Sequence, residues 1–250
     1  MNKKPILIQF AMEVESQELL KKIDNLEELE INNYKFYKGN INNYPIVISL
    51  SKVGLIHTSS SLTIAIKEFN PQIIINTGIA GATDRNIHIG DIIIGKSCIN
   101  INSYRTSILK EGEGTNPKKW ELLTFLSGEE DRLIEKQANE TLLKLAKEQT
   151  TNSHGEIYLG KIGSGDVWNR EVDRILYLNK KYQILCEDME SIATYTIGNQ
   201  QNIPTISIKM ISDNSITGEE YNREVGKYLN DYILNYIKTI IDNIKLERTN

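Results

Sequence analysis

Hydrophobic residues along this chain follow two patterns that alternate: short apolar runs, and apolar residues repeated at helical spacing. The short runs predict strands at 5–10, 34–40, 44–50, 73–75, 89–94, 97–101, 156–164, 183–187 and 205–211. The helical spacing predicts helices at 17–23, 59–69, 130–148, 171–179, 191–200 and 219–245. This alternation implies right-handed crossovers with helices on both faces of a sheet. We therefore predict an α/β protein with three α/β/α layers around a central mixed, twisted sheet.

Two stretches depart from this alternation. The strands 34–40 and 44–50 are separated by an Asn-rich turn, which predicts a hairpin that is antiparallel to part of the sheet. Glycine and proline interrupt residues 104–128, although 120–126 has the spacing of a short amphipathic helix. A long excursion of this kind is typical of a lid or an interface segment. We find no internal repeat and no linker, so residues 1–250 are expected to form one domain.

The composition narrows the class of ligand. The formal net charge is −4, which argues against a protein that binds nucleic acid by neutralising its phosphates and favours a small-molecule ligand. The apolar runs are far shorter than the roughly 20 residues that a membrane-spanning helix needs. The apolar stretch near the start ends at Phe10 and is followed by Glu13 and Glu15, which a signal peptide would not contain. We expect a cytoplasmic protein with no membrane contact.

The cysteines and histidines do not suggest a metal or redox site. Cys98 and Cys186 are too few for a disulfide framework and lie in apolar, strand-like segments, so we expect buried thiols. The three histidines, His57, His88 and His154, are widely spaced and match no metal-ligand pattern. No metal and no organic cofactor is implied.

Four segments carry polar residues where predicted strands end, which is where α/β folds place ligands. Each segment alone has an ordinary explanation: solvated carboxylates, a glycine turn, acids favoured at a helix start, or capping. Together they form one constellation. The segments are Ala-Met-Glu-Val-Glu at 11–15, Asn-Thr-Gly-Ile-Ala-Gly-Ala at 76–82, Cys-Glu-Asp-Met-Glu-Ser at 186–191 and Lys-Met-Ile-Ser-Asp-Asn at 209–214.

In this order and at these distances, the four segments resemble the nucleosidase branch of the purine nucleoside phosphorylase superfamily, the methylthioadenosine/S-adenosylhomocysteine nucleosidases. The shared features are Ala-Met-Glu-x-Glu, Asn-Thr-Gly-x-Ala-Gly, a Met-Glu pair that opens a helix, and Ile-Ser-Asp at the end of a strand. The resemblance covers nearly the whole chain. It implies a nucleoside phosphorylase-like fold, a homodimer, and hydrolysis of the N-glycosidic bond of a purine nucleoside.

The resemblance also assigns the two chemical steps. Cleavage of this bond produces an oxocarbenium-like sugar and a purine that leaves poorly unless it is protonated. By resemblance, Asp213 is the acid that protonates purine N7, and Ser212 orients it. Glu15 matches the glutamate that holds and deprotonates the attacking water, whereas Glu13 is expected to be a solvated neighbour.

The remaining positions match residues that bind the substrate. Glu190 matches the carboxylate that accepts hydrogen bonds from the ribose 2′- and 3′-hydroxyls, and the backbone of Met189 is expected to pack below the sugar. Asp188 and Lys209 correspond to supporting positions that orient Glu190. Further residues expected to bind the substrate are Trp168, which stacks on the purine, Asn169, whose backbone reads the purine edge, and Val53, Ile79, Ala80 and Gly81.

This chain departs from the family pattern in two places. Ile79 stands where the family commonly has serine, and residues 100–104 lack the His-Asp-containing stretch expected after Cys98. The group at the sugar 5′ position therefore stays open: methylthio, homocysteinyl, hydroxyl or another group. A divergent paralogue that prefers adenosine or a futalosine-type nucleoside is an alternative.

Two other functions compete with hydrolysis. Phosphorolysis needs an anion site, which related phosphorylases build from a glycine-rich loop and several arginines. Here the first loop carries Glu15, which would repel phosphate. A binding protein without catalysis is the second alternative, but it would have no use for Glu15, Glu190 and Asp213 together.

Overall fold

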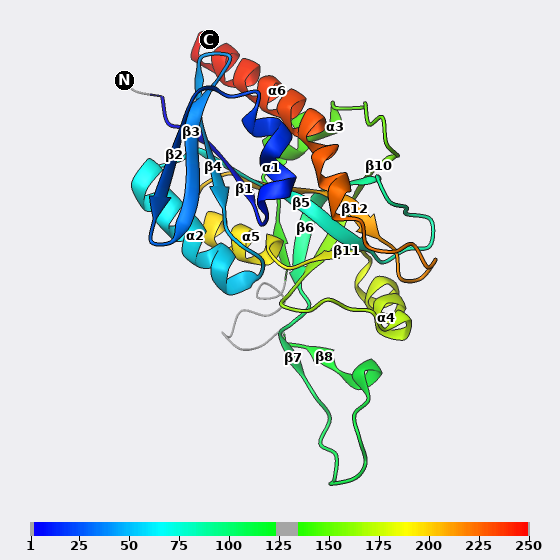
Figure 1. Cartoon of the computed structure of the whole chain (residues 1–250). Coiled ribbons are helices and arrows are strands. Elements are labelled where there is room, and N and C mark those ends of the chain that lie inside the picture. Colours follow the sequence, from blue (N-terminus) through cyan, green and yellow to red (C-terminus); the bar gives the residue numbers. More distant parts are fainter. Residues whose placement is uncertain (1–2, 124–134, 250) are drawn as a thin grey trace.

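A mixed sheet runs through the part of the chain that the computed structural model describes, residues 3–123 and 135–249 (Figure 1). Its strands pair in the order β11-β10-β6-β12-β5-β1-β4-β3-β2, and β9 pairs with β6. Parallel pairs dominate the centre, whereas β3 is antiparallel to both β2 and β4. The strands are β1 (Ile6–Phe10), β2 (Asp24–Ile31), β3 (Tyr34–Ile41), β4 (Tyr44–Leu50), β5 (Ile73–Ala82), β6 (Ile92–Asn100), β9 (Glu135–Gln137), β10 (Ile157–Ser164), β11 (Ile184–Asp188) and β12 (Thr205–Asp213).

Helices cover both faces of the sheet (Figure 1). Alternate residues of β1 point to opposite faces: Ile8 belongs to the cluster that includes Leu19 of α1 and Tyr236 of α6, whereas Leu7 packs in the cluster that includes Leu62 of α2. This arrangement confirms the predicted three-layer α/β/α fold with a central mixed sheet. The helices are α1 (Glu13–Leu20), α2 (Leu55–Phe69), α3 (Glu140–Lys147), α4 (Val172–Tyr182), α5 (Ser191–Gln200) and α6 (Leu229–Thr249).

Strand β5 is long and has one partner beyond its two neighbours in the sheet. It pairs in parallel with β1 and β12 along most of its length. At its carboxyl end, Ala82 and Gly81 also pair with Cys186 and Glu187 of β11 in antiparallel register. The sheet therefore closes on itself at this end, and strands β11 and β12 both reach Gly81.

The strand boundaries differ from the predicted ones where polar residues take part in the sheet. The segment 76–82, predicted as a loop after a short strand, is the second half of β5, and β12 continues through Asp213. The strands predicted at 89–94 and 97–101 are one strand, β6. The sequence pattern misses β2, because this edge strand pairs only with β3 and most of its side chains are exposed.

The helix boundaries also need correction. Helix α1 begins at Glu13 rather than at 17, so Glu13 and Glu15 lie in its first turn and not in a loop. The predicted helix 130–148 is wrong in its first half: β9 precedes α3, whose start is capped by the Asn139 side chain, which accepts the N–H of Leu142 at 3.1 Å. Residues 130–134 lie outside the described residues.

Two further segments differ from the prediction. In the excursion 104–128, the two-residue strands β7 (Tyr104–Arg105) and β8 (Glu121–Leu122) pair with each other, so the first part of the helix predicted at 120–126 is wrong, and 124–126 lie outside the described residues. In the predicted helix 219–245, a short 3-10 helix at Arg223–Lys227 precedes α6.

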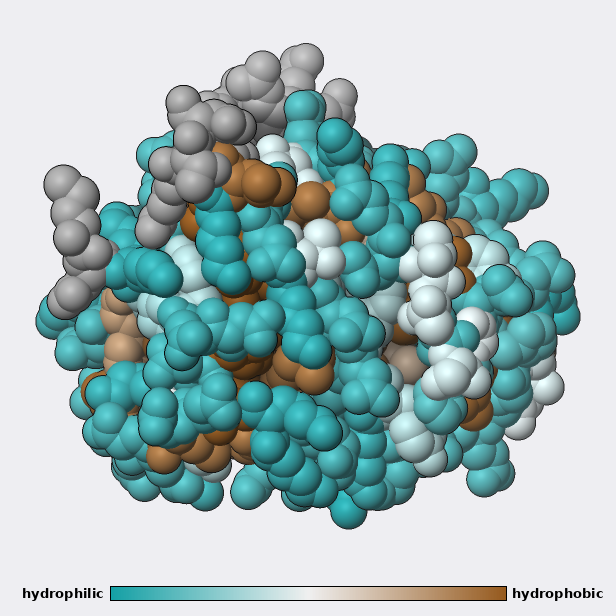
Figure 2. All heavy atoms as spheres, turned by 90° about the horizontal axis from the view of Figure 1, so that it is seen from above, coloured by the Kyte–Doolittle hydropathy of each residue, from teal (hydrophilic) through white to brown (hydrophobic). Residues whose placement is uncertain are grey.

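The surface is mainly polar on the face shown in Figure 2, where hydrophobic side chains are visible only in small areas between hydrophilic ones. Within residues 3–123 and 135–249, none of the helices combines the length and apolar character that crossing a bilayer requires.

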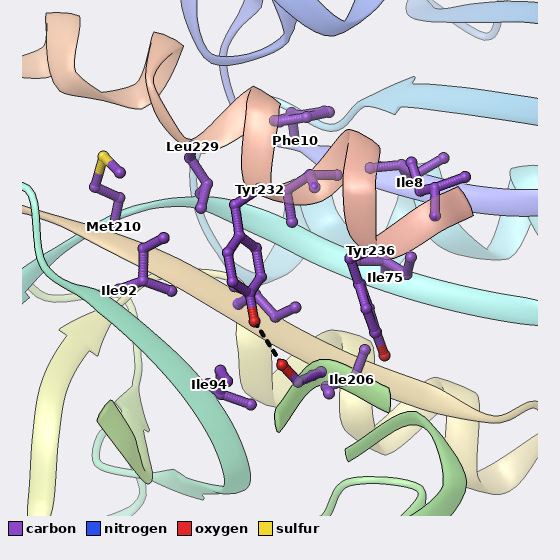
Figure 3. Close-up of a cluster of buried hydrophobic side chains, with 14 of the residues drawn as sticks. Ile8, Phe10, Ile75, Ile92, Ile94, Ile206, Met210, Leu229, Tyr232 and Tyr236 are labelled. Carbon is purple, nitrogen blue, oxygen red and sulfur yellow. Dashed lines mark hydrogen bonds between the residues drawn. The ribbon is translucent and has the colours of Figure 1, made fainter. Parts of the chain in front are cut away.

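Helix α6 is attached to the core through two tyrosines (Figure 3). Tyr232 and Tyr236 are both buried among isoleucines of the sheet, including Ile75 and Ile206. The hydroxyl of Tyr232 donates to the carbonyl of Ala146 at 2.9 Å, which is the dashed line in Figure 3. The hydroxyl of Tyr236 donates to the carbonyl of Leu142 in α3 at 2.7 Å. Each buried hydroxyl therefore has a hydrogen-bond acceptor in the backbone of α3.

We predict that Tyr236→Phe lowers the free energy of unfolding by about 1–2 kcal/mol, because it removes the buried hydrogen bond from the tyrosine hydroxyl to the carbonyl of Leu142. Tyr228→Phe is the matched control, since Tyr228 is exposed, and it should change stability by less than about 0.5 kcal/mol. Urea denaturation followed by circular dichroism measures both. Equal effects of the two substitutions would contradict the role of the buried hydrogen bond.

Candidate active site

A pocket of about 220 Å³ lies where β5, β11 and β12 end and α1 begins. It collects residues from all four segments that the sequence singles out, together with the loop before α4. All the predicted site residues except Lys209 line it: Glu15, Val53, Ile79, Ala80, Gly81, Trp168, Asn169, Asp188, Met189, Glu190, Ser212 and Asp213.

Glu15 is held at the base of the pocket by backbone groups from two segments. Its Oε2 accepts the N–H of Met12 at 2.8 Å, and its Oε1 accepts the N–H of Ile79 at 3.0 Å. Gly78 permits this approach, since its φ is 142° and a Cβ there would lie 2.6 Å from Glu15 Oε1. Glu13 is exposed, as predicted.

The environment of Glu15 suits a base. Burial raises the pKa of its carboxyl, while the charge of Lys209 and the N–H groups of Met12 and Ile79 act in the opposite direction. A raised pKa makes a carboxylate a stronger proton acceptor once it is ionised.

Asp213 is the last residue of β12 and lies beside Gly81 of β5, with which it is in register. The hydroxyl of Ser212 donates to Asp213 Oδ1 at 2.7 Å, and it also lies 3.2 Å from the carbonyl oxygen of Ala80. A Cβ at Gly81 would lie 3.3 Å from Asp213 Oδ2, so the second carboxyl oxygen is on the Gly81 side. Ser212 therefore holds one oxygen of Asp213 by a hydrogen bond, and its role in orienting a catalytic acid stays a prediction.

Lys209 lies beneath the pocket and is almost completely buried. Its Nζ is 2.8 Å from Asp188 Oδ2 and 3.6 Å from Glu190 Oε2. Burial alone would lower the pKa of Lys209, but Asp188 and Glu190 outweigh it and hold that pKa above its ordinary value. The lysine is therefore a fixed positive charge that joins two acids, which fits the supporting positions predicted for Asp188 and Lys209.

Glu190 reaches from this cluster into the pocket. Its Oε1 accepts the N–H of Gly54 at 3.1 Å, while Oε2 faces Lys209. Burial raises the pKa of Glu190, and Lys209 acts against this rise. Both carboxyl oxygens are oriented before any ligand arrives, which suits a group that accepts hydrogen bonds from hydroxyls.

Trp168 stands at the mouth of the pocket and is 57% exposed. Its ring is 5.1 Å from that of Tyr221, measured between centroids, at an interplanar angle of 61°. Tyr221 follows β12 along the chain and belongs to none of the four segments. The two rings give the pocket an aromatic wall, and the stacking of a purine on Trp168 stays a prediction.

The sequence interpretation misses several residues that line the pocket. Glu187 lies within the predicted acidic segment but was assigned no role, because a strand pattern does not say which face a side chain takes until the register is known. The other lining residues without a predicted role lie within the singled-out segments or elsewhere in the chain: Ala11, Met12, Ala82, Val167, Ile175, Ser215 and Tyr221.

The pocket thus combines an oriented carboxyl group at Asp213, a buried carboxylate at Glu15 and a third acid at Glu190. Such a set can supply a proton at one place and remove one at another. Within the described ranges 3–123 and 135–249, no three His, Cys, Asp or Glu side chains are grouped so as to hold a metal ion.

The family model described as the phosphorylase superfamily matches residues 5–236, and the chain belongs to this superfamily. The 5′-methylthioadenosine/S-adenosylhomocysteine nucleosidase of Staphylococcus carnosus is 30% identical over 237 residues, covering 92% of this chain and 97% of the relative. Within the superfamily, the chain is a member of the family of these nucleosidases. The resemblance inferred from the four segments is therefore confirmed.

Solved structures share the fold. The nucleosidase of Streptococcus pneumoniae, solved with the transition-state inhibitor MT-ImmA, superposes with a TM-score of 0.77 at 22% identity and covers 94% of this chain and 99% of its own. Futalosine hydrolase of Helicobacter pylori gives a TM-score of 0.76 at 23% identity, covering 96% and 98%. The predicted nucleoside phosphorylase-like fold is confirmed.

We predict that Lys209→Met destabilises the protein by about 3–5 kcal/mol, because it leaves Asp188 and Glu190 buried without their shared cation. Lys118→Met is the control: Lys118 pairs with Asp173 at the surface, and its loss should change stability by less than about 1 kcal/mol. Denaturant unfolding compares the two variants. A small effect at both positions would show that the buried charge is not needed for stability.

Proposed function

We propose that this protein is a purine nucleosidase that hydrolyses the N-glycosidic bond of 5′-methylthioadenosine, S-adenosylhomocysteine or a related adenosine derivative, releasing adenine and the ribose moiety. The observation that carries the proposal is that Glu15, Glu190 and Asp213 line one pocket. The names of the relatives support the class of substrate.

The reaction needs one proton donor and one activated water. The bond between ribose C1′ and purine N9 breaks, and its electron pair goes to the purine. Asp213, oriented by Ser212, gives a proton to N7, so the base leaves as a neutral molecule. Glu15 takes a proton from the water whose oxygen forms the new bond to C1′.

Binding groups hold the nucleoside between these two residues. Glu190 accepts hydrogen bonds from the ribose hydroxyls, and the Lys209–Asp188 pair keeps it in place. Met189 packs below the sugar. The purine stacks on Trp168 and meets the backbone of Asn169, while the other walls come from Val53, Ile79, Ala80 and Gly81.

The lining of the pocket favours hydrolysis over phosphorolysis. None of its lining residues, all in the described part of the chain, is arginine or lysine. Five of the lining residues are acids: Glu15, Glu187, Asp188, Glu190 and Asp213. A phosphate ion would meet like charge without a compensating donor, which disfavours its binding.

We expect the purified chain to release adenine from 5′-methylthioadenosine at the same rate with and without phosphate, because water is the nucleophile. Base release is followed by chromatography, and the sugar product is identified by mass spectrometry as a free sugar rather than a sugar phosphate. A rate that requires phosphate would replace this proposal by phosphorolysis.

In the same assay, Asp213→Asn and Glu15→Gln should each lower kcat by at least about 100-fold while the protein stays folded, since each removes a proton-transfer group. Glu13→Gln is the matched control, because Glu13 is exposed on the same helical turn, and it should keep a near-normal rate. Near-normal activity of Asp213→Asn or Glu15→Gln would refute the role given to that residue.

The same proposal includes a homodimer. Val53 lines the pocket and is 44% exposed, and Ile56, in the first turn of α2, is 76% exposed. Apolar side chains exposed beside a pocket suit contact with a second copy of this chain. The buried free thiols of Cys98 and Cys186 are consistent with a cytoplasmic location, where thiols stay reduced.

We expect sedimentation velocity at micromolar concentration to give twice the monomer mass, and Ile56→Glu to shift the protein toward monomer. Lys67→Glu, on the last turn of the same helix, serves as the control for added charge and should leave the mass unchanged. A monomeric wild-type protein would rule out the dimer.

A further inference from the structure

Glu187 lines the pocket, yet the proposed reaction gives it no task. It lies on β11, directly opposite Gly81 of β5, and Asp213 of β12 is in register with the same glycine from the other side. The closure of the sheet thus places Glu187 and Asp213 on the two flanks of one residue that has no side chain. A group bound over Gly81 is within reach of both carboxyls.

The carboxyl group of Glu187 is only half satisfied. Its Oε2 accepts a hydrogen bond from Nδ2 of Asn169 at 2.5 Å. Its Oε1 is buried and has no hydrogen-bond partner among the described residues. A buried, unpaired carboxylate oxygen costs free energy, so this arrangement favours a ligand that brings a donor to that atom.

The groups around Glu187 bring its pKa close to neutral pH. Burial raises the pKa of Glu187 to about 7; Asn169 and Arg174 act against this rise, and Asp213 adds to it. Arg174 is not a hydrogen-bond partner of Oε1, and its Nη1 donates to the carbonyl of Pro117 at 3.0 Å. Above pH 7, Glu187 is mainly an ionised group that accepts hydrogen bonds and donates none.

The position of Asp213 tells which part of the substrate meets Glu187. In the proposed reaction Asp213 contacts N7 of the purine, and the substituent on C6 is the neighbour of N7 on the six-membered ring. In adenine this substituent is an amino group, which has two N–H donors. Glu187, on the other flank of Gly81, is therefore next to a donor of the kind that Oε1 lacks.

We propose that Glu187, positioned by Asn169, is a specificity-determining residue that accepts a hydrogen bond from the 6-amino group of the purine. This inference rests on the proposed nucleosidase function and extends it to the choice of base. A site built around such an acceptor rejects a purine that lacks the amino group, because Oε1 then stays buried and unpaired. The loss corresponds to roughly 10- to 100-fold in kcat/KM.

The test compares adenosine with purine riboside, which differs from adenosine only by hydrogen in place of the 6-amino group. Values of kcat/KM are measured at pH 8 for the wild type, Glu187→Leu and Glu187→Gln. The quantity of interest is the ratio of the two substrates for each enzyme. Any loss of folded protein or of general catalytic efficiency cancels in that ratio.

We expect the wild type to prefer adenosine, and Glu187→Leu to lose at least about 10-fold of that preference, since leucine has no acceptor. Glu187→Gln keeps an amide oxygen and should retain more of the preference than Glu187→Leu. If Glu187→Leu keeps the wild-type ratio within twofold, the inference is refuted.

Failure of the proposed function is distinguishable from failure of this inference. If the wild type releases no base even from 5′-methylthioadenosine, the proposed reaction is wrong. If it cleaves 5′-methylthioadenosine but neither of the two nucleosides, binding of free adenine and free purine is measured by calorimetry instead. If Glu187→Leu lowers the affinity for adenine but not for purine, this supports recognition of the 6-amino group by Glu187. Equal changes for adenine and purine refute it.

Discussion

Lys209 is almost completely buried, with its ammonium group between Asp188 and Glu190, and the order of the whole site depends on this contact. Without a cation between them, two acids so close to each other in a place of low polarity would repel each other. The lysine comes from the middle of β12, whereas both acids come from the end of β11 and the turn after it. The charge pair therefore ties together two strands that carry the other polar groups of the pocket, and it fixes the direction of Glu190 before substrate binds.

Strand β5 is the second constraint, because two of its glycines leave room for the carboxylates of the pocket. Gly78 lies against the carboxylate of Glu15, and Gly81 lies against that of Asp213. Larger residues at these points would displace the acids. The same strand also binds β11 at its carboxyl end, which closes the sheet and brings acids from three separate segments around one cavity. The chemistry of the site is thus a result of how one strand is paired.

The sequence predicted the fold and most of the site because these rest on local patterns. Apolar runs and helical repeats indicated the α/β layers, and acids after predicted strands indicated that Glu15, Glu190 and Asp213 would meet at one edge. The pattern missed β2, which is an exposed edge strand of mostly polar residues, and it placed Glu15 in a loop although α1 already includes it. It also gave Glu187 no role, because the orientation of that side chain depends on pairing between β11 and β5, two segments about a hundred residues apart. Long-range register is a property of the folded chain that a local pattern does not contain.

The surplus of acids in this pocket has a consequence for inhibitors. The lining has no basic side chain among its residues, and Lys209 beneath it is already shared by Asp188 and Glu190. The sugar gains positive charge as the glycosidic bond breaks. An analogue with a protonated nitrogen in the sugar ring would carry a positive charge at the same place, between carboxylates that are fixed before binding. An uncharged analogue of the same shape would gain none of this attraction. Selective blockers of this enzyme should therefore be bases that are cationic at neutral pH.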